Sequence, residues 1–527
     1  MNQENDVALV QHLSKQGVDD KMVMGHPASL FVLFFTEMWE RFSYYGMRAL
    51  LTVFLITEVA KQGWGWTNQE AMELYGWYTG LVYLTPLVGG MIADKLTGYR
   101  KAILIGALIM TMGHAAMAFE HISANFFYLG LVLMILGNGM FKPNISSMVG
   151  QLYPDNSMKK DAGYTIFYMG INCGAFLGML LCGYIGEKVG WHYGFGLAGV
   201  FMFFGMVQFY FAQKIFGKIG EKPGTVHVEE KLAAVEEEEE ETPKNIVRDR
   251  LVVVAVLMLA SVFFFFAFEQ AGGSMTIFAK DYTQRLLDGN AGEIFKWVDA
   301  ALTIFPILIV TWVLFKLSQK IYDRYPMTVI ATAISFAIIW ALGFWKVYRE
   351  FNLAQTEVTV SWFQILNSFF IITLASSFSK LWEKVWNPSG PVKFAFGLIL
   401  VAVGFVALAY GSMSIPQGAK TASVSMIWLI LAYFFHTTGE LCVSPVGLSY
   451  VSKLSPKKFA GLLFGLWFTA SAIANFIAGK TGSYIDHIVE KYSMSTFFLI
   501  IAALPVAVAL LLLIFNGKLK KMMHGIN

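Results

Sequence analysis

Fourteen apolar segments, each long enough to cross a lipid bilayer as a helix, recur along almost the whole chain. A membrane-spanning helix needs about 20 predominantly apolar residues, and within lipid its backbone polar groups must pair with one another. The sequence therefore predicts an all-α polytopic membrane protein of about fourteen transmembrane helices. The predicted spans are 29–57, 72–94, 101–119, 124–149, 162–186, 192–215, 251–279, 298–320, 327–346, 360–381, 393–411, 424–450, 458–478 and 494–516.

The composition agrees with a protein that lies mostly in lipid. Of the 527 residues, 56% are hydrophobic and only 14% are charged, a balance far too apolar for a soluble chain of this length. The net charge of +3 comes without a dense run of Lys and Arg, which argues against a nucleic-acid partner. Residues 1–28 carry several charges and no apolar signal-peptide core, so we expect the first span itself to direct insertion.

The three cysteines, Cys173, Cys182 and Cys442, all fall in apolar segments and lack the spacing of metal ligands. Cysteines in such surroundings act as small buried apolar residues. We therefore expect no disulfide framework, no metal site and no cofactor.

Basic residues are unequally distributed between the loops on the two sides of the predicted membrane. If the N-terminus is cytoplasmic, about twice as many Lys and Arg fall on that side as on the other, the bias typical of cytoplasmic loops. Both termini are then cytoplasmic, and the chain divides into five parts. These are an N-terminal tail (1–28), an N-terminal six-helix bundle (29–215), a cytoplasmic acidic linker (216–249), a C-terminal bundle (250–516) that includes an extra helix pair (298–346), and a C-terminal tail (517–527).

The linker contains Glu229, Glu230 and an unbroken glutamate run at 236–241. Because like charges repel one another and keep a chain extended, we expect a flexible tether between two bundles. A regulatory contact is the alternative.

Charged residues stand inside the first predicted span, in the stretch TEMWERFSYYGMRAL. At about 100° per residue, Glu37, Glu40, Arg41 and Arg48 share one face of a helix with two tyrosines. Glu37 and Arg41 are four residues apart, which is close enough to pair. A charge at mid-bilayer costs about 2.5–3.5 kcal/mol on insertion scales, so such residues normally face a protein interior or a water-filled path. The alternative is a static salt-bridge cluster that fixes helix packing.

The other charges within predicted spans are Lys142, Glu269 and Glu440. If two helices between the seventh and twelfth spans are an insertion, the charged helices become numbers 1, 4, 7 and 10 of a twelve-helix core. That period of three is typical of two six-helix halves built from three-helix repeats, and it predicts that the charges converge on one cavity. With the first span, the set holds one negative charge more than positive charges, which suggests that a carboxylate binds a transported proton.

Several motifs together resemble the proton-dependent oligopeptide transporters of the major facilitator superfamily. ExxERFxYYG is complete at 37–46, FYMGINCGAF stands at 167–176, and GNGMFKPN lies in the fourth span. PLVGGMIADKLTGYRK is similar to the superfamily's loop motif after its second helix, and QILN, PSGPVKFAFG, GELCVSP and FGLWF match later core helices. The resemblance covers nearly the whole chain.

The resemblance implies two six-helix bundles plus two extra helices at 298–320 and 327–346, inserted after core helix 7. It implies a bacterial-type proton symporter that imports di- and tripeptides by alternating access, as a monomer in the inner (plasma) membrane. Glu440 is similar to the family's clamp for the peptide ammonium, and Arg48 would pair with Glu269 as an extracellular gate.

The other roles are also implied only by the resemblance. Proton coupling falls to Glu37, Glu40, Arg41 and Lys142; peptide binding to Tyr45, Arg48, Tyr83, Lys142, Tyr168, Asn172, Asn367, Glu440 and Ser444; and the side-chain pocket to Phe265, Phe268 and Trp467. For the aromatic residues, simple packing is the alternative.

Two residues depart from the family's pattern. Phe265 stands where relatives often have Trp, and Gly76 stands where animal relatives carry a histidine, so coupling here must rest on carboxylates. The main alternative function is a same-fold proton-coupled carrier of nitrate, an amino acid or a peptidomimetic. A channel is a further alternative, and an enzyme is disfavoured because neither HExxH nor a nucleophile elbow occurs.

Overall fold

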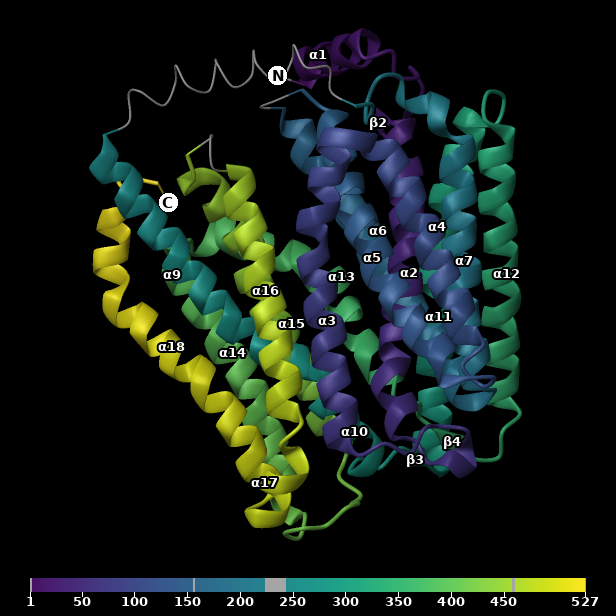
Figure 1. Cartoon of the computed structure of the whole chain (residues 1–527), viewed down its shortest axis with the longest axis vertical. Helices are drawn as coiled ribbons and strands as arrows, with labels where there is room; N and C mark the ends of the chain where they lie inside the picture. Colours follow the sequence, from purple (N-terminus) through teal and green to yellow (C-terminus); the bar gives the residue numbers. More distant parts are fainter. Residues whose placement is uncertain (1, 155–156, 223–242, 457–459, 527) are drawn as a thin grey trace. The chain divides into compact units, whose positions relative to one another are not determined.

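The computed structural model describes residues 2–154, 157–222, 243–456 and 460–526, and most of them lie in helices (Figure 1). The helices of the first half are α1 (Asn2–Lys15), α2 (Ala28–Ile56), α3 (Asn68–Ile92), α4 (Tyr99–Ala118), α5 (Ala124–Gln151), α6 (Met158–Lys188), α7 (Trp191–Phe211), α9 (Lys244–Phe268) and α10 (Ser274–Asp281). Those of the second half are α11 (Gly289–Ile321), α12 (Pro326–Phe351), α13 (Trp362–Lys380), α14 (Gly390–Gly411), α15 (Ile427–Leu454), α16 (Ala460–Gly482), α17 (Ile485–Lys491) and α18 (Met494–Met522).

Short elements complete the described chain. The 3-10 and π turns are η1 (Val59–Lys61), η2 (Ala93–Thr97), η3 (Gln213–Phe216), η4 (Glu269–Gly272), η5 (Leu381–Val385) and η6 (Ser412–Ser414). Two antiparallel pairs of strands are β1 (Met22–Val23) with β2 (His26–Pro27), and β3 (Leu286–Leu287) with β4 (Thr356–Glu357).

Each predicted span coincides with a long helix, which confirms the all-α polytopic fold. Within the described residues, eleven helices are long and apolar enough to cross a membrane, α9 to α10 counting as one run. The other three predicted spans are α2, α3 and α16. α2 falls short of the same standard because charged residues crowd its middle, as the sequence indicates.

Contacts divide the chain into two compact units. Unit 1 comprises Met1–Leu51, Thr85–Pro223 and Arg285–Ile365; unit 2 comprises Thr52–Leu84, Gly224–Gln284 and Leu366–Asn527. This division differs from chain order, because the extra helix pair, α11 and α12, packs on α6 and α7 of unit 1. The acidic stretch 223–242 lies outside the described residues.

Glycines allow the helices of unit 1 to approach closely. A Cβ on Gly106 of α4 would lie 2.7 Å from the carbonyl oxygen of Gly137 on α5. A Cβ on Gly174 or Gly178 of α6 would lie 2.1 or 2.2 Å from a backbone oxygen of α2. Small residues of this kind let membrane helices pack backbone to backbone. Here they allow close packing of α4 on α5 and of α6 on α2.

α12 also contacts α2 directly. The ring of Phe336 packs edge-on against Phe35 and Trp39, with centroids 5.7 and 5.5 Å apart. Nearby, the Thr332 hydroxyl donates to Gln208 of α7 at 2.5 Å, and the Gln208 amide donates to Thr36 of α2 at 3.0 Å. The inserted helix α12 therefore packs, together with α7, against α2, the helix that carries Glu37, Glu40 and Arg41.

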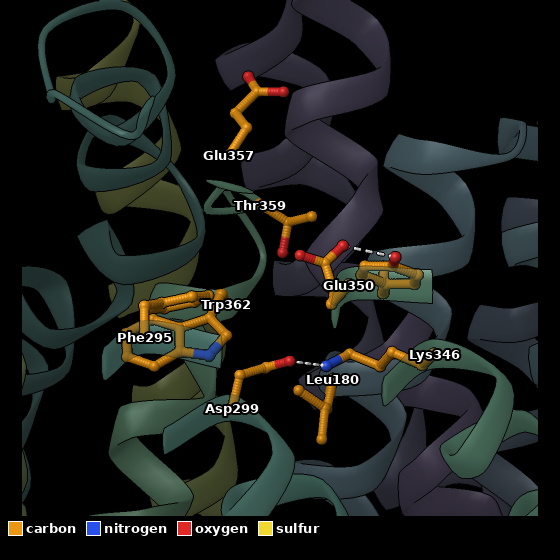
Figure 2. A pocket seen from close by; sticks show the side chains of 9 residues that line it. Leu180, Phe295, Asp299, Lys346, Glu350, Glu357, Thr359 and Trp362 are labelled. Atoms are coloured by element: carbon orange, nitrogen blue, oxygen red, sulfur yellow. Dashed lines mark hydrogen bonds and ion pairs between the residues drawn. The ribbon is translucent and has the colours of Figure 1, made fainter. Parts of the chain in front are cut away.

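A buried cluster of charges connects α11 and α12 to α6 (Figure 2). Lys346 of α12 donates to Asp299 of α11, and these side chains are 2% and 5% exposed. The Tyr184 hydroxyl of α6 donates to Glu350 at 2.6 Å. The cluster encloses a cavity of about 10 Å³, walled on its apolar side by Phe295 and other residues. The sequence did not single out these charges.

Unit 2 is built around α14, which packs against both α15 and α18. The end of α2 and the start of α3 also belong to it. There α3 crosses α16 so closely that a Cβ on Gly479 would lie 2.3 Å from the Cα of Gly76. A histidine at position 76 would not fit this crossing, which gives a physical reason for the departure seen in the sequence.

Candidate functional site

The charged residues of α2 form one buried cluster in unit 1. Glu37, Glu40 and Arg41 are 2%, 0% and 2% exposed. Arg41 Nε lies 3.0 Å from Glu37 Oε1 and also donates to Glu40. The pairing of residues 37 and 41 expected from their spacing is therefore present, and one guanidinium faces two carboxylates.

Helix α5 adds two polar groups to this cluster. The Asn138 amide donates to Glu40 Oε1 at 2.9 Å and is itself fully buried. One helical turn later, Lys142 lies close enough to Glu37 for electrostatic attraction. The four residues to which we assign proton coupling thus lie together, and Asn138 joins them.

Aromatic rings flank the two arginines of α2. The Arg41 guanidinium lies over the rings of Tyr44 and Tyr45, at 5.4 and 5.9 Å from their centroids. Arg48, two turns along and 8% exposed, lies 5.8 Å from the Tyr45 centroid. The ring of Tyr45 therefore stands beside both cations, where cation–π attraction holds each guanidinium in place.

The remaining predicted residues of the first half lie on α3 and α6. Asn172 is buried, and its amide donates to the Tyr168 backbone oxygen at 3.0 Å. The Tyr168 side chain is 42% exposed. Tyr83, on α3, is half-buried and belongs to unit 2.

In unit 2, Glu440 of α15 is paired with Asn367 of α13. The Asn367 amide donates to Glu440 Oε2 at 3.0 Å and to the Thr437 hydroxyl at 3.2 Å. Glu269 lies close enough to Glu440 for the two carboxylates to repel each other. Ser444 follows one turn after Glu440 and is partly buried. The arrangement concentrates negative charge, with one amide as donor, and so could bind a cation such as an ammonium.

Glu269 stands at a break in its helix, because α9 ends at Phe268 and η4 begins at Glu269. Hydrogen bonds fix this break: Thr52 donates to the Gly272 oxygen at 2.7 Å, and Gln270 donates to the Ala478 oxygen at 3.1 Å. The Glu269 carboxylate, 4% exposed, is thus held on a short irregular segment rather than on a regular helix.

The three aromatic residues expected to line a pocket differ in their surroundings. Phe265 and Phe268 are half-buried, and their rings meet edge to face at 6.2 Å. Trp467 is 4% exposed and packs edge-on against Phe394 of α14. Its indole also fills the space beside Gly447, where a Cβ would lie 2.2 Å from the ring. Trp467 is therefore packed among the helices of unit 2, whereas Phe265 and Phe268 remain partly accessible.

The units separate the predicted residues into two groups. Unit 1 holds the α2 cluster, Lys142, Tyr168 and Asn172, whereas unit 2 holds Glu440 and the groups around it. The sequence reasoning missed Asn138 and Thr437. Asn138 lies four positions before Lys142, and Thr437 lies three positions before Glu440. Residues at this spacing share a helix face, so the sequence could have indicated that both belong to the site.

Comparison with known families identifies the chain. The family model described as POT family matches residues 100–235 and 326–497. The chain belongs to the POT family. It is 33% identical to a Bacillus subtilis protein named Uncharacterized transporter YclF, over 97% of this chain and 98% of that protein. It is 31% identical to the Di-/tripeptide transporter of Lactococcus lactis subsp. cremoris, over 98% and 100%, and 31% identical to Peptide transporter YePEPT of Yersinia enterocolitica, over 88% of each.

Solved structures of the family share the fold. The peptide transporter POT in complex with sulfate superposes with a TM-score of 0.74 at 28% identity, over the whole of both chains. A POT family transporter in complex with 5-aminolevulinic acid gives 0.74 at 25% identity, over 96% of this chain and 99% of that one. The protein is therefore a multi-pass membrane transporter of the major facilitator type and not an enzyme, as the sequence predicted.

Proposed function

We propose that this protein is a proton-coupled symporter that imports di- and tripeptides by alternating access. The observation that carries the proposal is the match, over nearly full length, to relatives named as peptide transporters. The buried cluster of two carboxylates around Arg41 supports it, because intramembrane carboxylates beside basic groups are the usual material of proton relays.

The division of roles follows the chemistry of a peptide, which carries an ammonium at one end and a carboxylate at the other. We assign the ammonium to Glu440 with Asn367 and Asn172, and the carboxylate to Arg48, Lys142 and Tyr45. Tyr83, Tyr168 and Ser444 would contact the peptide, and Phe265, Phe268 and Trp467 would face its side chains. Arg48 and Glu269 would act as the gate pair.

Proton binding is assigned to the α2 cluster. Protonation of Glu37 or Glu40 would weaken its attraction to Arg41 and so change which partner the guanidinium and Lys142 engage. Each proton that enters the cell would release roughly 2.3 kcal/mol of free energy per 100 mV of membrane potential. This free energy is enough to drive accumulation of the peptide.

The cellular setting is part of the proposal. The relatives come from bacteria, and we place the protein in the plasma membrane, with both termini and the acidic linker cytoplasmic. We expect it to function as a monomer.

Uptake of labelled dialanine into proteoliposomes tests the proposal. With an imposed inward proton gradient, the wild type should accumulate the peptide above its external concentration, and equal uptake without the gradient would argue against symport. Glu40→Gln and Lys142→Ala should lose gradient-driven uptake while retaining counterflow exchange. Glu440→Gln should bind free-amine peptides more weakly, and the exposed Glu490→Gln is its matched control.

A further inference from the structure

A group of possible metal ligands lies in unit 1, apart from every residue assigned above. It consists of Glu120, His121 and His192, whose ligand atoms all lie within 4.8 Å of one another. The first two stand in the turn between α4 and α5, and the third is the second residue of α7. The sequence alone does not indicate this group, because it contains no cysteine and its two segments lie about 70 residues apart along the chain.

The backbone holds the two segments in place. In the turn, Glu120 N–H donates to the Met117 oxygen at 3.0 Å, and Ile122 N–H donates to the Phe119 oxygen at 3.0 Å. α4 and α7 pack against each other. The positions from which the three side chains extend are therefore fixed by secondary structure and helix packing.

The two imidazoles already lie close together, with their planes tilted by 49°. Their ring centroids are 5.1 Å apart, and the His192 ring also lies against Tyr193 at 4.0 Å. Glu120 and His192 are half-buried and His121 is exposed, so an ion could reach the group from solvent.

We propose that Glu120, His121 and His192 bind a zinc ion. Two imidazole nitrogens and one carboxylate oxygen are ligands that suit Zn²⁺ and not Mg²⁺ or Ca²⁺. With bonds of about 2.0–2.1 Å, ligand atoms in a tetrahedral site stand roughly 3.3 Å apart. Modest side-chain rotations close the present separations to that value, because Glu120 has a long flexible side chain and His121 is exposed. A water molecule would complete the tetrahedron.

The bound ion would connect the α4–α5 turn to the start of α7. It would lie outside the residues assigned to peptide and proton, so the proposal does not depend on the proposed function. Under the orientation proposed above, the site faces the outside of the cell, where zinc has access without crossing the membrane.

Calorimetric titration of the full-length protein with Zn²⁺, after purification without a polyhistidine tag, tests the site. We expect one Zn²⁺ per chain, and binding weaker by roughly tenfold or more in both His121→Ala and His192→Ala. His192→Gln preserves side-chain size and is the second variant at that position in case the alanine variant folds poorly. His487→Ala, at an exposed histidine of α17, should bind as the wild type does.

Two further measurements sharpen the result. Co²⁺ should give the visible absorption of a tetrahedral site in the wild type and lose it in Glu120→Gln, whereas Mg²⁺ at the same concentration should produce no binding heat. The absence of Zn²⁺ binding, wild-type binding in either histidine variant, or equal binding of Mg²⁺ would each overturn the proposal.

Discussion

The buried ion pair of the extra helix pair allows a quantitative prediction. Replacing Lys346 with Met removes the partner of Asp299, whose side chain is only 5% exposed. The carboxylate would then stand in the protein interior with no cation against it. By contrast, replacing both residues, with Asp299→Leu and Lys346→Met together, removes both charges of the pair, while Glu350 keeps its hydrogen bond from Tyr184. Thr303 still donates to the Asp299 backbone oxygen in either case.

The magnitudes follow from the burial of the pair. Breaking a buried ion pair by removing one partner costs about 3–5 kcal/mol, whereas replacing both partners by apolar groups is often neutral or stabilising. At roughly 2 °C per kcal/mol, the lower end of the range for large domains, Lys346→Met should lower the thermal midpoint by about 6–10 °C. The double variant should stay close to the wild type.

Tryptophan fluorescence during heating of the detergent-purified protein measures these midpoints. Lys61→Met is the matched control, because Lys61 makes an ion pair with Glu58 in which the two side chains are 74% and 57% exposed. Exposed ion pairs contribute little to the free energy of unfolding, so the thermal midpoint of Lys61→Met should equal that of the wild type. A double variant less stable than Lys346→Met alone, or a single variant equal to the wild type, would refute the reasoning.

Three other perturbations have definite expected outcomes. Asn138→Leu removes a buried donor from Glu40, an interaction whose loss costs about 1–3 kcal/mol, and should reduce gradient-driven peptide uptake several-fold in proteoliposomes. Gly479→Val places a Cβ 2.3 Å from the facing backbone of α3 and should abolish the monodisperse peak in size-exclusion chromatography. Burial alone would raise the pKa of Asp19, but the hydrogen bond and charge of Arg324 hold that pKa below its usual 3.8. Wild type should therefore melt above Asp19→Asn at neutral pH, and this difference should vanish as the pH falls through the lowered pKa.

Each of these expectations has a result that would contradict it. Full gradient-driven uptake by Asn138→Leu would contradict the role given to that amide. Gly517→Val, at a glycine with open space around it, should remain monodisperse, and a Gly479→Val protein that behaves likewise would show that the crossing tolerates a side chain. If the difference in thermal midpoint between wild type and Asp19→Asn grew toward acidic pH, the pKa of Asp19 would not be lowered in the folded protein.

The membrane spans were predictable because each one depends only on local composition. The pairing of Glu37 with Arg41 followed from helical spacing for the same reason. The contacts of Asn138 and Asp299 were not predictable, since their partners lie about 100 and 47 positions away along the chain and no local pattern relates them. Helix α1 was also missed, because its few apolar residues, such as Leu9, become buried only against other elements.

The packing of the extra helix pair has a consequence for how the transporter could move. Residues 285–365 belong to unit 1, although the segments on both sides of them belong to unit 2. The chain thus leaves unit 2 and returns to it by way of two short connections, at 284–285 and 365–366. The first of these is anchored by the Arg285–Glu357 ion pair at 3.1 Å and the β3–β4 ladder. The chain also passes between the units at 51–52, 84–85 and 223–224. A rotation of one unit against the other would be absorbed by backbone torsions near these crossings, and the connections at 284–285 and 365–366 are two of the natural places for hinges.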